Sequence, residues 1–115
     1  MKCNQLIKPY ILALLWVCSL TTNLKADTKR IVLIAGPPSH GVLQHEHKAG
    51  CMLIERCLQD VSGVEVDVYT GGWPEDPNAL EGADAVVVFC TGGGNHLAIQ
   101  EGRLAQLSKV MGGGA

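Results

Sequence analysis

A continuous apolar run at residues 31–35, Ile-Val-Leu-Ile-Ala, constrains the fold of this chain more than any other feature. A run of this length without polar alternation is typical of a strand buried on both faces, as in a parallel sheet. Gly36-Pro37-Pro38 ends the run, and a polar loop and a helical pattern follow. This order predicts the first half of a parallel β-α-β unit, in which ligands bind at the carboxyl ends of the strands.

Two further strands and two helices are predicted downstream. Val64, Val66 and Val68 alternate with acidic residues, which is typical of an edge strand with one wet face. Residues 86–89 are apolar without alternation, which indicates an interior strand covered on both faces. The predicted strands cover residues 30–35, 64–69 and 83–90, the helices run from between 43 and 46 to about 60 and from 97 to 111, and a short helical turn covers 78–82.

Apolar residues at helical spacing predict which face of each helix packs on the sheet. They are Ala49, Met52, Leu53, Cys57 and Val61 in the first helix, and Leu104, Leu107, Val110 and Met111 in the second. The order of elements predicts an α/β fold of the flavodoxin-like kind, a parallel sheet between two helical layers. No strand pattern follows the second helix, so we expect a domain truncated at that point, which a C-terminal half or fused domains would complete in a longer form.

Residues 1–26 have the pattern of a secretory signal peptide. Two lysines precede an almost wholly apolar stretch at residues 11–20, and Leu24-Lys25-Ala26 resembles a cleavage site. The apolar stretch is about half of the ~20 residues that a membrane-spanning helix needs. We therefore predict export to the periplasm or the extracellular space, with residues 27–115 as one domain and no stable membrane span after cleavage.

Charge and cysteine content exclude several classes of partner and scaffold. Residues 27–115 carry six basic and eleven acidic residues, with no basic cluster, which argues against nucleic acids and anionic membranes as partners. Their three cysteines, Cys51, Cys57 and Cys90, are too few for a disulfide scaffold. One disulfide bond that involves Cys90 is an alternative. The simpler interpretation is that the three cysteines are small buried hydrophobic residues.

The four histidines are expected to converge. His40, His45 and His47 follow the first strand and His96 follows the third, and neighbouring parallel strands open on the same edge of the sheet. His45 and His47 are the candidate metal ligands, with zinc as the divalent ion considered, because an extended loop would place both rings on one side. The alternative is that both are polar residues of a loop or first helical turn.

Three other features suggest ligand contacts, each with a structural alternative. Cys90 with His40 or His96 is a conceivable nucleophile pair, but a buried cysteine at a strand end is commoner. Gly92, Gly93 and Gly94 either present N–H groups to an anion or sugar oxygen or form a plain turn. Trp73 either stacks on a sugar ring or covers the core.

In combination these motifs resemble the ThuA-like (trehalose-utilisation) domains. The motifs are RIVLIAG at residues 30–36, PSHG at 38–41, HEHKAG at 45–50, VDVYTGGWP at 66–74 and GGGNH at 92–96. ThuA-like domains are similar in fold to class I glutamine amidotransferases and are associated with sugar catabolism. Val42-Leu43 departs from the pattern, since turn-forming residues are expected there.

The resemblance implies a carbohydrate or another small molecule as ligand, and it implies a site that contains His40, His47 and His96. We therefore predict an exported domain linked to carbohydrate metabolism, with acid–base or metal-assisted chemistry at these histidines. A non-catalytic module that binds sugar or protein, and an inactive truncated product, are the alternatives.

Overall fold

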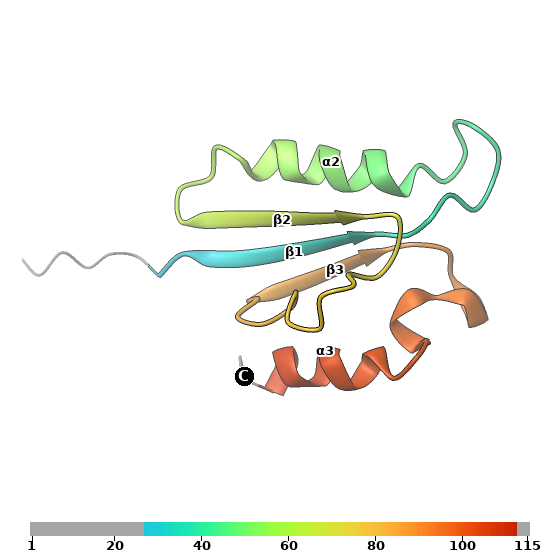
Figure 1. Ribbon diagram of the computed structural model, residues 1–115. Helices are drawn as coiled ribbons and strands as arrows, with labels where there is room; N and C mark the ends of the chain where they lie inside the picture. The colour runs from blue at the N-terminus through green and yellow to red at the C-terminus, as the bar shows by residue number, and fades with distance from the viewer. Residues whose placement is uncertain (1–26, 113–115) are drawn as a thin grey trace, which may run out of the picture.

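The computed structural model describes residues 27–112 and shows a parallel sheet between two helices (Figure 1). The elements in chain order are β1 (Lys29–Ala35), α2 (His47–Leu58), β2 (Val64–Thr70), β3 (Ala85–Phe89), two short 3-10 helices (Gly93–Asn95 and Leu97–Ile99) and α3 (Arg103–Gly112). The predicted signal peptide lies outside the described residues. No helix in the described part of the chain is long and apolar enough to span a membrane.

The sheet has the strand order β2-β1-β3, and both pairs of strands are parallel. β1 is the central strand, and residues 32–35 are fully buried, as the apolar run predicts. The predicted α/β fold is therefore confirmed, and so is the position of β2 at an edge. Because β1 and β3 are neighbours, the loops that follow them open on the same edge of the sheet.

Successive residues of β1 point to opposite faces of the sheet and so build two cores. Leu33 and Ala35 pack with Cys51 of α2 on one face. Val32 and Ile34 pack on the other face, together with partly buried residues of α3. Figure 1 shows α2 above the sheet and α3 below it. Burial of the Cys51 thiol raises its pKa, which keeps this side chain in its neutral, apolar form.

The predicted sheet-facing side of the first helix is wrong. Met52 and Leu53 are 49% and 64% exposed, and Cys57 is also exposed. The buried positions are His47 and Cys51, with Gly50 beneath the ring of Phe89. A Cβ at position 50 would lie 2.8 Å from Phe89 Cδ1 and closer still to Cε1, so a larger residue at this position would have to displace the Phe89 ring.

The second helix and the third strand are shorter than predicted. Residues 97–99 form a separate 3-10 turn, and α3 begins only at Arg103. The backbone between them is left-handed at Glu101 (φ 49°) and Gly102 (φ 73°), which no continuous α-helix tolerates. The predicted interior strand, β3, pairs only with β1 among the described residues, so it lies at an edge.

Asp84 joins the starts of β1 and β3. Its carboxylate accepts hydrogen bonds from the Arg30 backbone N–H (2.8 Å) and from Lys29 Nζ (2.9 Å). The backbone bond first, and the Lys29 bond second, lower the pKa of Asp84. Hydrogen bonds to Asp84 and then to Asp27 raise the pKa of Lys29.

The lowered pKa of Asp84 makes the contribution of this residue to the free energy of unfolding depend on pH. Because the folded-state pKa lies below the unfolded one, this contribution is complete above about pH 4 and is lost as the pH falls through the lowered value. We expect the unfolding free energy of Asp84→Asn to fall less steeply below about pH 4 than that of the wild type. Urea unfolding across this pH range measures both slopes, and equal slopes would contradict the assignment.

Candidate functional site

The loop between β1 and α2 brings three histidine rings together. The ring centroids of His40 and His45 are 4.0 Å apart and the planes meet at 62°, while the centroids of His45 and His47 are 6.2 Å apart. The loop turns through left-handed backbone at Leu43 (φ 66°) and His45 (φ 50°). The Glu46 carboxylate accepts a hydrogen bond from the Leu43 N–H at 2.8 Å, which holds this turn closed.

The two ends of this histidine group differ in exposure. His47 is 4% exposed; its Nδ1 lies 3.1 Å from the Pro37 carbonyl oxygen, and its ring meets the ring of Phe89 edge-on at 5.2 Å. His47 therefore ties the loop to α2 and to β3. His40 and His45 are exposed, and His40 Nδ1 lies 3.0 Å from the Ser39 hydroxyl.

A cavity of about 430 Å³ opens beside these rings, at the carboxyl ends of β1 and β2. Its walls include His40, His45, His47, Lys48, Thr70 and Gly71. This is the position that the β-α-β order predicts for a ligand site. Lys48 and Thr70 were not among the predicted site residues. Only their positions in the chain could have indicated them, because Thr70 ends an edge strand and Lys48 lies in the first turn of a helix.

The structure does not bring His96 into this group. His96 Nδ1 accepts a hydrogen bond from the Ala98 N–H (3.2 Å), so the side chain caps the 3-10 turn at residues 97–99. Its ring lines a different cavity, of about 360 Å³, between β3 and α3. The neighbouring residues Asn95 and Leu97 do reach the vicinity of His40. The two loops meet as expected, but the ring of His96 faces the α3 layer.

Cys90 lies at the meeting point of these loops. Its Sγ accepts a hydrogen bond from the Leu97 N–H and donates one to the Thr91 carbonyl, both at 3.4 Å. It shares a cavity of about 340 Å³ with Ser39 and His40. Within residues 27–112, each of the three cysteines is a free thiol. The hydrogen bonds of Cys90 hold the loop after β3, which accounts for its position without a catalytic role.

Trp73 and the glycine loop lie apart from the histidine cavity. Trp73 Nε1 donates a hydrogen bond to Gln106 Oε1 of α3 at 2.8 Å, and the ring packs on the core beneath α3, with the Arg103 guanidinium 5.4 Å from its centroid. This arrangement favours the role of a cover for the core. Gly92, Gly93 and Gly94 are exposed and lead into the 3-10 turn Gly93–Asn95.

The described histidines do not form a complete metal site. In the described region of the chain, no three His, Cys, Asp or Glu side chains are grouped so that they could hold a metal ion. A structural zinc site needs four such ligands, and a catalytic site needs three. His45 and His47 therefore do not provide enough ligands for a zinc ion on their own.

Comparison with protein-family models, with curated proteins and with solved structures finds no significant match to this chain. The fold and the cavity define a parallel α/β protein with a histidine-lined site at the carboxyl edge of its sheet. The resemblance to ThuA-like domains stays a prediction from the sequence motifs.

Proposed function

We propose that the chain binds a small hydroxylated ligand of the carbohydrate class in the histidine cavity, and that His40 and His45 transfer protons to and from it. The observation that supports this most directly is the contact between the two exposed imidazole rings, 4.0 Å apart, in the wall of a cavity of about 430 Å³. Cavities of about 300–1,000 Å³ hold small molecules. The ThuA-like motifs support the choice of a carbohydrate.

The imidazoles and several polar groups in or beside the wall have a chemical role in this proposal. Imidazole exchanges protons near neutral pH, so one ring can accept a proton from a ligand hydroxyl while the other donates one. Ser39 orients His40 through its hydroxyl, 3.0 Å from Nδ1. Lys48 and Thr70 offer hydrogen bonds to ligand oxygens. His47, fixed by Pro37, supports the floor of the cavity.

Calorimetric titration with a panel of mono- and disaccharides tests the binding step. For a sugar that binds, we expect His40→Ala and His45→Ala each to weaken binding by about tenfold or more, because each removes hydrogen-bonding groups from the cavity wall. His96→Asn is the matched control. It keeps an acceptor for the Ala98 N–H, it lies outside this cavity, and it should leave the affinity unchanged.

Proton transfer is tested separately with the same sugar. Proton NMR of the mixture reports any conversion, and His45→Gln, which keeps hydrogen-bonding groups but not the imidazole, should bind the sugar and fail to convert it. Binding that survives both alanine variants, or that is lost equally in His96→Asn, would contradict the proposed site. Binding without conversion in the wild type would contradict the catalytic part alone.

A further inference from the structure

The backbone groups along the outer edge of β3 have no pairing strand within residues 27–112. Among the residues that the structure describes, β3 pairs only with β1. The Phe89 carbonyl accepts a hydrogen bond from the Gly36 N–H at 2.9 Å, so the odd-numbered residues of β3 direct their backbone groups to β1. Because this direction alternates along a strand, the N–H and C=O groups of Val86 and Val88 point away from β1.

The two edges of the sheet differ in charge. β2 carries the exposed Glu65 and the half-buried Asp67, and an antiparallel copy of β2 centred on Asp67 would place two carboxylates opposite each other. Like charges in that position are destabilising. β3 is Ala-Val-Val-Val-Phe, without a charge or a proline. Charged residues and prolines are the usual protection of an edge strand, and β3 lacks both.

The sequence of β3 is complementary to itself. In an antiparallel pair centred on Val87, each Val86 lies opposite Val88 of the other copy, and such pairs exchange both backbone hydrogen bonds. These are the residues whose backbone groups point outwards. On the α2 side of the sheet, the small Ala85 lies opposite the large Phe89, so side-chain volumes match across the pair.

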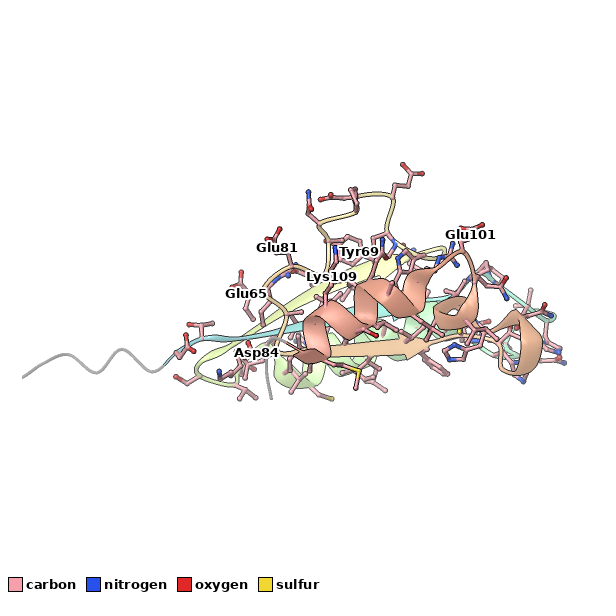
Figure 2. All side chains as sticks on the ribbon, turned by 90° about the horizontal axis from the view of Figure 1, so that it is seen from below. Glu65, Tyr69, Glu81, Asp84, Glu101 and Lys109 are labelled. Carbon is pink, nitrogen blue, oxygen red and sulfur yellow. The ribbon has the colours of Figure 1, made fainter. Side chains whose placement is uncertain are left out.

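Apolar side chains around this edge are exposed. Val87 is 38% exposed and Phe89 is 41% exposed, although both belong to a sheet. Leu53 of α2 is 64% exposed, and it follows Gly50, which faces Phe89, by three residues, so it borders the same edge. Figure 2, viewed from the α3 side, shows β3 along one border of the sheet, with the labelled Glu65 and Tyr69 of β2 towards the opposite border.

We propose that the partner of this edge is a second copy of the chain, paired through antiparallel β3 strands about a two-fold axis at Val87. The pair forms a continuous sheet in the order β2-β1-β3-β3-β1-β2. Five residues of strand pairing bury less surface than standard interfaces of about 1,200–2,000 Å². The dimer is therefore expected to dissociate on dilution, and the histidine cavities lie outside the contact.

Sedimentation equilibrium over a range of concentrations tests this proposal. We expect a monomer–dimer equilibrium for the wild type, and we expect Val87→Lys to raise the dissociation constant by about tenfold or more, because two ammonium groups then meet at the axis. Val87→Glu should do the same, because two carboxylates then meet there. Glu65→Lys is the matched control at the other edge of the sheet and should leave the equilibrium unchanged.

Mixing the two charged variants makes the test specific to the strand pair. The ammonium group of one variant would face the carboxylate of the other across the axis, so the mixture should form a one-to-one dimer at concentrations at which each variant alone is largely monomeric. Far-UV circular dichroism confirms that each variant is folded. A wild type that stays monomeric at the highest concentration reached, a dissociation constant that Val87→Lys leaves unchanged, or a mixture that dimerises no more strongly than either variant alone would each overturn the proposal.

Discussion

Gly36→Ala is expected to lower the free energy of unfolding by about 3 kcal/mol, and the melting temperature by more than about 10 °C. A Cβ at this position would lie 2.5 Å from Cys90 Cβ and 3.0 Å from Cys90 Cα. Both atoms belong to or adjoin the backbone at the end of β3, so no side-chain rotation relieves the clash. The Gly36 N–H also donates to the Phe89 carbonyl at 2.9 Å, and this bond is strained when the strands separate.

Two comparisons isolate the steric cause. Gly41→Ala is the control in the same loop, because nothing lies within 4 Å of a Cβ there, and its effect should stay within about 1 kcal/mol. In Cys90→Gly the clashing Cβ is absent, so adding Gly36→Ala to this variant should cost clearly less than adding it to the wild type. Urea unfolding of the wild type and the four variants measures these free energies, and additive effects of Gly36→Ala and Cys90→Gly would show that the contact between Gly36 and Cys90 is not the cause.

The fold could be predicted mainly from one strand, β1, whose sequence indicates the centre of a parallel sheet. The unbroken apolar run of β1 indicates burial on both faces, and the structure places residues 32–35 at the centre of the sheet. The acidic alternation of β2 correctly indicated an edge strand. β3 shows the limit of this reasoning, since its apolar residues indicate two covered faces whereas Val87 and Phe89 are partly exposed.

The orientation of α2 could not be predicted from its apolar residues. Its apolar positions spread around more than half of the helix circumference, so they do not indicate one buried side. Which side faces the sheet depends on Phe89, which is about forty residues away in the sequence and packs against Gly50. A glycine and a histidine on the buried face give no hydrophobic signal. Helical periodicity therefore predicted the helix correctly and its rotation incorrectly.

The site was predicted at the level of loops but not at the level of side chains. Parallel topology was enough to place the loop of His40 near the loop of His96. Which way each ring points depends on local backbone, and neither the left-handed turn at His45 nor the capping of a 3-10 turn by His96 has a clear sequence signature. The same limit applies to Trp73, whose partner Gln106 lies on a helix 33 residues away.

Arg30→Met is expected to lower the free energy of unfolding by about 2 kcal/mol. The guanidinium donates to Asp67 Oδ2 from Nε at 2.8 Å, to the Glu81 carbonyl at 2.7 Å and to the Ala79 carbonyl at 2.9 Å. These bonds fasten the turn at residues 76–82 to β1, and that turn inserts the buried Leu80 into the core. Methionine keeps much of the apolar stem but leaves the carbonyls and the carboxylate without their charged donor.

Two further variants separate the carbonyl contacts from the ion pair. Arg56→Met is the surface control, because Arg56 donates, among the described residues, only to the Gln59 side chain, at 3.0 Å, and its loss should cost no more than about 0.5 kcal/mol. In an Asp67→Asn background, Arg30→Met should keep more than half of its effect, since both carbonyl bonds are still lost. Protease cleavage at residues 76–82 should rise in parallel. If the effect vanishes in that background, the ion pair with Asp67, whose side chain is 39% exposed, would be the anchor instead of the turn.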